Sequence, residues 1–237
     1  KNRSLIVLDY WLSEDNTEFI YLLDDIVEAK ARQLKPKKIT ELRPIHDFEI
    51  TVEKGLTFSL LKNIHGLIVG NTSSSKTTFL KSLLAQVFMF DSEVDLTILD
   101  VKSEFSSWTF LQKGVVLSDS EEILAYFEEL LELVIKREKE IAKLSARDDI
   151  TGATFVNFGK EMDMKLCIIE EYSAMLSSIT DNKMRKRVQD LVLSIVSRSR
   201  SSGVYICICM QQPRAELLST AIRDNLGVRI CLSNGAI

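Results

Sequence analysis

Short apolar runs alternate with longer amphipathic stretches over most of this chain. The runs are too short for buried helices and show little alternation of apolar and polar residues, which is typical of strands in a parallel sheet covered on both faces. The longer stretches space their apolar residues three and four apart, as one buried helix face requires. We therefore predict an α/β fold, a mainly parallel sheet with helices on both faces. The predicted strands span 67–69, 96–99, 166–169, 204–210 and 228–232, and the predicted helices span 77–90, 118–144 and 182–197.

The first 48 residues do not share this pattern. A short strand is predicted over 5–10 and a helix over about 17–34, followed by a proline- and lysine-containing stretch that is typical of a linker. We therefore predict a small N-terminal α/β segment with its linker over 1–48 and a second domain over 49–237. The chain lacks an initiating Met and stops inside strand-like sequence, so we expect it to be a C-terminally incomplete piece of a longer protein.

Composition narrows the class of protein. A chain of 237 residues with 46% hydrophobic content can bury a full core. A net charge of −4 disfavours a protein that coats DNA generally, but it is compatible with a ring that touches DNA through a few loops. The apolar run 204–210 is far shorter than the roughly 20 residues of a membrane span. The four cysteines lie in apolar stretches without zinc-ligand spacing, so we expect reduced core residues.

The stretch GNTSSSKTT, residues 70–78, lies between a predicted strand and a predicted helix. A phosphate-binding loop has glycine, four residues, then Gly-Lys-Ser/Thr; here Gly70, Lys76 and Thr77 are in place, and Ser75 occupies the second glycine position. Lys76 is expected to reach the β- and γ-phosphates of ATP, and the Thr77 hydroxyl to bind Mg²⁺. The candidate ATP-binding residues are Gly70, Asn71, Thr72, Ser73, Ser74, Ser75, Lys76, Thr77 and Thr78.

Ser75 is the departure with a physical cost. The usual glycine often adopts a positive φ, which costs a residue with a Cβ about 1–2 kcal/mol. The backbone N–H survives the change, so we expect phosphate binding with reduced activity. The other interpretation, a Ser/Thr-rich loop with a solvated lysine, does not explain the strand–loop–helix context.

Two further polar groups follow predicted strands. Glu170 and Glu171 come directly after 166–169, and Gln211 follows 204–210. Ligands of α/β sheets bind beyond the carboxyl ends of the strands, so these residues are expected near the loop. We predict that Glu170 holds the water shell of Mg²⁺, that Glu171 polarises the attacking water and that Gln211 senses the γ-phosphate. Taken alone, Glu170 and Glu171 fit an exposed helix start as well as they fit a catalytic pair, and it is Lys76 that favours the catalytic interpretation.

These motifs together resemble the FtsK/SpoIIIE motor domain. The family pattern runs His-Leu-Leu-hydrophobic, phosphate loop, Asp-Pro-Lys, Asp-Glu after four hydrophobic residues, Gly-Arg-x-x-Gly and Thr-Gln-Arg-Pro. In the same order, this chain has His65-Gly-Leu-Ile, the loop at 70–77, Asp100-Val-Lys102, Glu170-Glu171, Ser199-Arg200-Ser-Ser-Gly203 and Met210-Gln211-Gln212-Pro213. Its departures from the pattern include Ser75, Val101, Glu170 and Gln212. Residues 221–230 also look like the matching stretch of Gram-positive conjugative coupling proteins.

The resemblance implies a RecA-like P-loop ATPase that works as a homo-oligomeric, hexameric ring and moves double-stranded DNA. It also implies a cytoplasmic domain of a membrane-anchored bacterial protein, with components of a secretion channel as partners. Such motors supply an arginine across the subunit interface. Arg200 is the first candidate and Arg198 the second, although either alone reads equally well as a surface residue at a helix end. The basic residues of 183–187 favour a solvated helix face over a DNA contact.

Two other functions remain open. One is an ATPase of the same superfamily that drives type VII protein secretion, a class in which degenerate nucleotide loops occur. The other is a nucleotide-binding or scaffold module that does not hydrolyse ATP. The three functions differ in what stimulates ATP hydrolysis. DNA should stimulate a DNA translocase, a small helical protein substrate should stimulate a secretion ATPase, and a nucleotide-binding module should bind ATP without hydrolysing it.

Overall fold

The computed structural model describes residues 5–12, 19–25, 32–71, 74–105, 114–148, 151–213 and 216–232. The chain divides into two compact units: the first holds Lys1–Leu42 and Thr51–Thr57, and the second holds Arg43–Ile50 and Phe58–Ile237. No helix in the described ranges is both long and apolar enough to cross a bilayer. The predicted domain division after residue 48 stays a prediction.

An antiparallel pair of strands opens the chain. β1 (Leu5–Leu12) pairs with β2 (Phe19–Asp25), with a shift of register between Val7 and Asp9. The predicted helix over 17–34 is therefore wrong across 19–25. This segment is rich in aromatic and β-branched residues, and a neighbouring strand supplies the hydrogen bonds that make it a strand. A 3-10 helix, η1 (Ile39–Leu42), follows, and β3 (Glu49–Glu53) and β4 (Leu56–Ser59) form a second two-stranded sheet.

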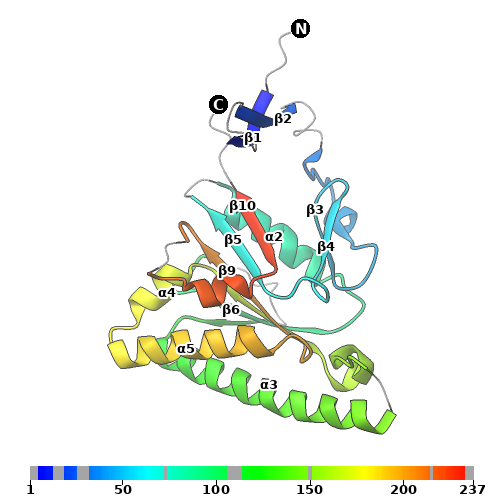
Figure 1. Ribbon diagram of the computed structural model, residues 1–237, viewed down its shortest axis with the longest axis vertical. Coiled ribbons are helices and arrows are strands. Elements are labelled where there is room, and N and C mark those ends of the chain that lie inside the picture. The colour runs from blue at the N-terminus through cyan, green and yellow to red at the C-terminus, as the bar shows by residue number, and fades with distance from the viewer. Residues whose placement is uncertain are drawn as a thin grey trace. The chain divides into compact units, whose positions relative to one another are not determined.

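The second unit is built on a six-stranded sheet in the order β10-β5-β9-β8-β6-β7, and each pair of neighbouring strands is parallel (Figure 1). This confirms the predicted α/β fold and all five predicted strands; β7 was not predicted. The strands are β5 (Gly66–Gly70), β6 (Val94–Leu99), β7 (Gly114–Leu117), β8 (Met164–Ile169), β9 (Val204–Met210) and β10 (Val228–Leu232).

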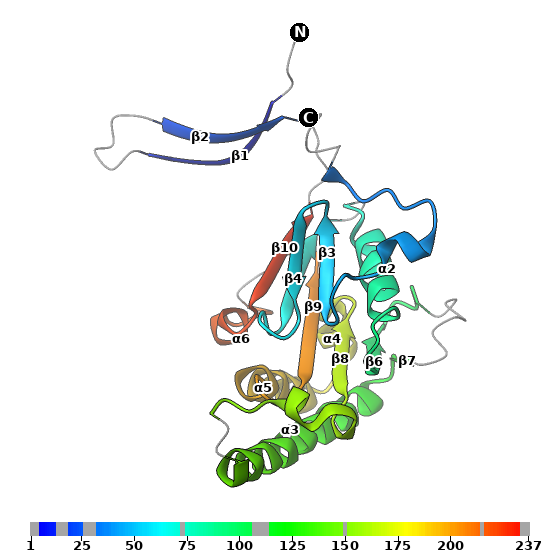
Figure 2. The same cartoon turned by 90° about the vertical axis from the view of Figure 1, so that its right-hand side faces the viewer.

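Helices cover both faces of this sheet (Figure 2). They are α2 (Lys76–Val87), α3 (Ser120–Asp148), α4 (Tyr172–Ser178), α5 (Asn182–Arg198) and α6 (Thr220–Asp224), with a 3-10 helix, η2 (Phe155–Glu161), before β8. Alternate residues of β9 enter two separate cores: Cys207 and Cys209 pack on the α2 side, whereas Ile206 and Ile208 pack on the side of α3 and α5. The period of two along a strand thus divides one apolar run between two helical layers.

Side-chain caps start the long helices. The backbone N–H groups of Glu121 and Glu122 donate to Asp119 Oδ1 at 2.8 and 3.2 Å, so Asp119 caps α3 one residue later than the predicted start at Ser118. Asp181 caps α5 in the same way, accepting from the Lys183 N–H at 2.8 Å. Such caps satisfy donors that a first helical turn leaves without partners.

Three of the four cysteines are core residues, as predicted: Cys167, Cys207 and Cys209 are buried. Cys231 is exposed, so the prediction is wrong there. It lies on β10, which is an edge strand of the sheet, and an edge strand is covered less completely than the strands between two neighbours.

At the amino ends of the strands, buried His65 joins three elements. Its Nδ1 accepts from the backbone N–H of Ile206 in β9 at 3.0 Å, so the proton is on Nε2, which lies 3.1 Å from Ser199 Oγ at the end of α5. Burial lowers the pKa of His65 to about 4, although a hydrogen bond with the backbone of Val196 acts in the opposite direction. The ring is therefore neutral at pH 7 and ties the start of β5 to β9 and α5.

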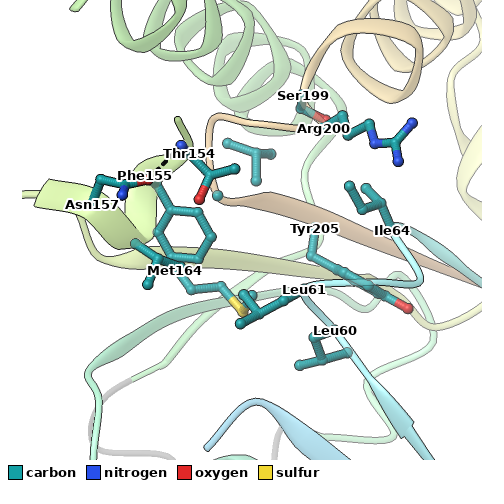
Figure 3. Close-up of a pocket in the computed structure, with 13 residues that line it drawn as sticks. Leu60, Leu61, Ile64, Thr154, Phe155, Asn157, Met164, Ser199, Arg200 and Tyr205 are labelled. Atoms are coloured by element: carbon teal, nitrogen blue, oxygen red, sulfur yellow. Dashed lines mark hydrogen bonds between the residues drawn. The ribbon is translucent and has the colours of Figure 1, made fainter. Parts of the chain in front are cut away.

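A cavity of about 300 Å³ opens close to this junction (Figure 3). Tyr205 of β9, Phe155 of η2 and Ile64 line it, and Arg200 lies at its rim. The cavity is thus at the amino ends of β8 and β9, and the opposite ends of the same strands carry the polar residues described next.

Candidate nucleotide-binding site

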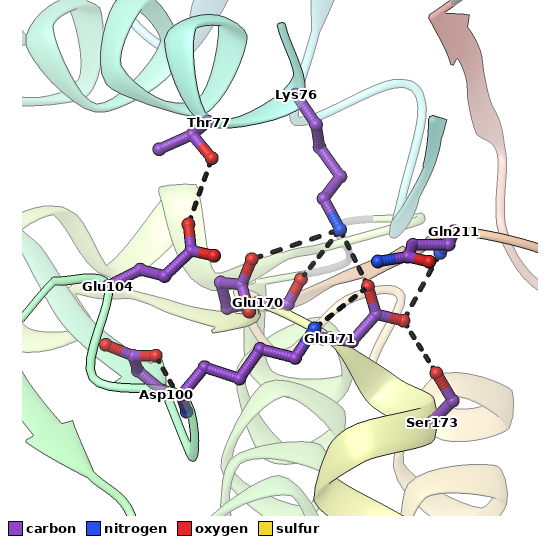
Figure 4. A network of polar contacts seen from close by, with 9 residues as sticks. Lys76, Thr77, Asp100, Glu104, Glu170, Glu171, Ser173 and Gln211 are labelled. Atoms are coloured by element: carbon purple, nitrogen blue, oxygen red, sulfur yellow. Dashed lines mark hydrogen bonds and ion pairs between the residues drawn. The ribbon is translucent and has the colours of Figure 1, made fainter. Parts of the chain in front are cut away.

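The carboxyl ends of β5, β6, β8 and β9 bring the predicted site residues together (Figure 4). Lys76 and Thr77 begin α2 after the loop that leaves β5, Glu170 and Glu171 follow β8, and Gln211 follows β9. The turn after β6 adds side chains from a fourth strand. Strand order explains this convergence, because β5, β9, β8 and β6 are consecutive neighbours in the sheet.

The loop after β5 is compact. A Cβ at Gly70 would overlap the Ser74 hydroxyl and press on Leu232 of β10, so the first position of the loop requires glycine. The Ser74 N–H donates to the Asn71 carbonyl at 3.0 Å, and the Ser74 hydroxyl is buried without a hydrogen-bond partner in the described part of the chain. Thr72 and Ser73 lie outside the described residues, and Thr78 is exposed on the first turn of α2.

Ser75 adopts the left-handed conformation that the sequence leads us to expect. Its φ is 63° and its ψ is 21°, and it occupies the N-cap of α2 without a capping bond from its side chain. A left-handed residue with a Cβ costs about 1–2 kcal/mol relative to glycine. The strain at this position is therefore not repaid by a local hydrogen bond of the serine hydroxyl to the start of the helix.

Lys76 is buried and held by acidic side chains. Its Nζ donates to Glu171 Oε2 at 2.8 Å, lies 3.4 Å from the Glu170 carbonyl oxygen and lies 3.9 Å from Glu170 Oε1. Lys102 approaches from the turn after β6, with its Nζ 3.9 Å from Glu171 Oε2. Glu171 Oε2 is thus the acidic oxygen nearest to Lys76 Nζ in the described part of the chain.

The two glutamates have opposite electrostatic surroundings, although both are buried. Burial raises the pKa of Glu170 above its usual range, and the charge of Lys76 only partly offsets this. Burial also acts to raise the pKa of Glu171, but hydrogen bonds from Lys76 and Ser173 outweigh it and the pKa is lowered. Glu171 is therefore ionised in this site. A further positive charge nearby would stabilise the ionised form of Glu170, whose pKa is raised.

Glu171 is fixed from three sides. Apart from Lys76, its Oε1 accepts from Ser173 Oγ at 2.6 Å and from the backbone N–H of Gln211 at 3.2 Å. Ser173 was not predicted, because a serine in a short helix carries no motif. Gln211 meets Glu171 through its backbone, and the predicted role of its side chain stays a prediction.

The turn after β6 is shaped by Asp100, which is buried. Its carboxylate accepts from the backbone N–H of Phe105 at 2.7 Å and of Lys102 at 3.3 Å, and Ser103 between them has a φ of 60°. From this turn, Glu104 accepts a hydrogen bond from Thr77 Oγ1 at 3.1 Å. Glu104 was not predicted, because nothing in the sequence links it to the loop after β5.

Arg200 does not join this site. It precedes β9, so it lies at the opposite end of the strand from Gln211, and it is exposed. No ion pair to Arg200 is found among the described residues, whereas Arg198 is paired with Glu138 of α3 at 2.6 Å. Of the two candidate arginines, Arg200 is thus the one free to act on another molecule.

The site suits a phosphate chain with a divalent cation. The start of α2 has backbone N–H groups without helical partners and carries Lys76, and a helix start of this kind favours phosphate. Glu170 Oε2 is buried without a hydrogen-bond partner within the described ranges, and it faces the same site as the Thr77 hydroxyl. Nowhere in those ranges do three His, Cys, Asp or Glu side chains form a group able to hold a metal ion. Mg²⁺ is commonly held by one or two carboxylates together with phosphate oxygens and water.

Curated proteins with similar sequences are related to this chain at low identity. The DNA translocase FtsK of Lactococcus lactis subsp. cremoris is 22% identical over 218 residues, covering 86% of this chain and 28% of that protein. The DNA translocase SftA of Bacillus subtilis is 23% identical over 188 residues, covering 75% of this chain and 19% of that protein. The chain thus spans between about a fifth and somewhat more than a quarter of the length of these relatives.

Solved structures share the fold. The pCW3 conjugation coupling protein TcpA, in its monomer form with ATPγS, matches with a TM-score of 0.72 at 18% identity, covering 96% of this chain and 65% of that one. EssC (ATPases 2 and 3) from Geobacillus thermodenitrificans matches with a TM-score of 0.63 at 12% identity, covering 84% of this chain and 40% of that one. A model of the FtsK/SpoIIIE family matches residues 22–230, most of the chain. With the loop, the glutamate pair and the sheet that unites them, this places the chain in the FtsK/SpoIIIE family.

Proposed function

We propose that this chain is the ATP-hydrolysing motor part of a DNA translocase that moves double-stranded DNA in conjugative transfer. The observation that carries the proposal is the buried contact between Lys76 and Glu171, which unites a phosphate-binding lysine and a general base at one point. Relatives named DNA translocases and the fold of a conjugation coupling protein solved with ATPγS support the substrate and the setting.

Binding of ATP would change the partner of Lys76. The ammonium group exchanges Glu171 Oε2 for oxygens of the β- and γ-phosphates, and Glu171 keeps its hydrogen bonds from Ser173 and Gln211. Glu171 is then an ionised base free to accept a proton from the attacking water. Thr77 and Glu170 would hold Mg²⁺, which supplies charge neutralisation at the phosphoryl oxygens. The side chain of Gln211 would contact the γ-phosphate.

Arg200 would act on the nucleotide of a second subunit. It is exposed, and it lies at the far end of β9 from the loop of its own chain. An arginine from a neighbouring subunit stabilises the charge of the transition state in many phosphoryl-transfer enzymes. This arrangement supports the proposed homo-oligomer, which is a hexameric ring. In this proposal the ring is formed by the cytoplasmic domains of a membrane-anchored protein, and it delivers DNA to secretion-channel components.

The second candidate function is protein secretion of type VII. The fold of EssC, and that of the type VII secretion ATPase EccC from Thermomonospora curvata with a TM-score of 0.57 at 19% identity, favour it over other functions of P-loop proteins. A module that binds nucleotide without turnover is the third. The three share the nucleotide site and differ in what stimulates hydrolysis.

Phosphate release measured with and without double-stranded DNA tests the proposal. We expect DNA to stimulate hydrolysis severalfold in the parent chain and to have no effect in the variant Lys76→Ala. Stimulation by a small helical secreted protein and not by DNA would move the assignment to the second candidate. Binding of ATP without hydrolysis under any of these conditions would move it to the third.

Ser75 offers a direct test of the loop. Since its φ of 63° suits glycine, Ser75→Gly should relieve about 1–2 kcal/mol of strain. The part of this strain that is imposed when the loop closes on the nucleotide should appear as a rise in affinity or turnover of up to about tenfold. Isothermal titration of both forms with a non-hydrolysable ATP analogue measures the effect. If the glycine form binds equally or more weakly, the loop is adapted to serine and the expectation of reduced activity is wrong.

A further inference from the structure

The hydroxyl of Thr77 has an acidic partner that the family pattern does not supply. In that pattern the acidic residues of the nucleotide site follow the strand that corresponds to β8, where this chain has Glu170 and Glu171. Here Thr77 Oγ1 donates to Glu104 Oε2 at 3.1 Å, and Glu104 comes from the turn after β6. The carboxylates of Glu170 and Glu171 instead lie at the ammonium group of Lys76 (Figure 4).

The turn holds Glu104 between two fixed points. Buried Asp100 accepts two backbone hydrogen bonds from the turn, and Phe105, which directly follows Glu104, is buried in the core on the α2 side of the sheet. Glu104 itself is exposed, so packing does not dictate the direction of its side chain. Its approach to Thr77 therefore rests on the hydrogen bond itself and on the position from which the turn presents it.

A hydroxyl that binds a cation does so through its oxygen lone pairs, and its single proton needs an acceptor on the other side. Acceptors of this kind orient metal ligands and raise their basicity. Resting on the proposed function, we propose that Glu104 is a positioning residue of the magnesium site. It accepts the hydrogen bond of the Thr77 hydroxyl, leaves the lone pairs of Oγ1 for the cation and adds a negative charge beside it.

The negative charge has opposite effects on two ligands. Close to a nucleotide without a cation, Glu104 repels the phosphates, because like charges in a partly buried site disfavour each other. Close to a nucleotide with Mg²⁺, it attracts the cation and holds its threonine ligand. The ratio of nucleotide affinity with Mg²⁺ to nucleotide affinity without it should therefore be larger when Glu104 is present. This ratio measures the coupling between the two ligands and not the affinity for either one.

The test measures this factor by isothermal titration of the full chain with ATPγS, in EDTA and in a series of free Mg²⁺ concentrations. The variants are Glu104→Gln, which keeps an acceptor but removes the charge, and Glu104→Ala, which removes both. We expect apparent Mg²⁺ affinity to fall in the order parent, Gln, Ala, with a loss of about tenfold to hundredfold for alanine. Binding in EDTA should be unchanged or tighter in both variants.

The matched control is Glu93→Ala, which removes an exposed glutamate just before β6, at the other end of that strand from Glu104. It should behave as the parent. Mg²⁺ dependence within twofold of the parent in both Glu104 variants would overturn the inference. So would equal weakening with and without Mg²⁺, since that would show a structural role. Failure of the parent chain to bind ATPγS would instead contradict the proposed function. The two failures are therefore distinguishable, because the first is seen in the parent and the second only in the variants.

Discussion

Replacement of Lys76 by alanine is expected to lower ATP affinity by up to about hundredfold. The ammonium group is buried at the start of α2, and it forms a charged hydrogen bond of 2.8 Å with Glu171 Oε2. Loss of a charged hydrogen bond to the phosphates removes up to about 3 kcal/mol of binding free energy. This corresponds to about two decades of affinity, measured by calorimetry at equal Mg²⁺.

The alanine variant also leaves Glu171 without its closest cation, and an unpaired buried charge destabilises the native state. The double variant Lys76→Ala/Glu171→Gln separates the two effects. It removes both charges, so thermal stability should recover toward that of the parent while ATP binding stays weak. If the single variant binds ATP as tightly as the parent, the assignment of residues 70–78 as a phosphate-binding loop is wrong.

The second large effect is expected for Glu171→Gln, which should stop hydrolysis while ATP still binds. The amide keeps an oxygen that can accept from Ser173 and from the Gln211 N–H, so the geometry is retained, but it cannot take a proton from water. Loss of a general base lowers turnover by about a hundredfold to ten-thousandfold. Single-turnover phosphate release measures this loss.

ATP affinity should rise in the same variant. In the parent chain, the Glu171 carboxylate competes with phosphate for Lys76, and the neutral amide competes less. A control with the same loss of charge is Glu128→Gln, which breaks the exposed ion pair with Arg187 and should alter neither quantity. Steady-state phosphate release equal to that of the parent would remove Glu171 from the catalytic role.

The sequence predicts the central sheet well because its strands are continuous apolar runs between loops. The prediction fails at 19–25, where a helix is expected but an apolar run with two aromatic residues is a strand of an antiparallel pair. Short elements escape it altogether: α4 and α6 have seven and five residues, too few to show a helical period. β3 and β4 lack a buried face that would mark them as strands.

The site follows the same division. Lys76, Glu170 and Glu171 are placed by rules about strand ends, and these rules hold because the strands are neighbours in the sheet. Glu104 and Ser173 reach the site through the shape of a turn and the start of a short helix, which depend on tertiary contacts such as those of Asp100. Arg200 precedes the strand 204–210 in the sequence, so the same rule about strand ends places it at the amino end of β9, away from Gln211.

The neutral ring of His65 makes this fold sensitive to acid. A proton added at Nδ1 would face the N–H of Ile206, donor against donor, at the point where the start of β5 meets β9 and the end of α5. The unfolded chain takes up that proton near pH 6.5, whereas the native chain resists it down to about pH 4. Between these values, falling pH favours the unfolded state, by about 3 kcal/mol in all. Acidification thus destabilises the packing at the amino end of β5, and the carboxyl end of the same strand leads into the loop at 70–77.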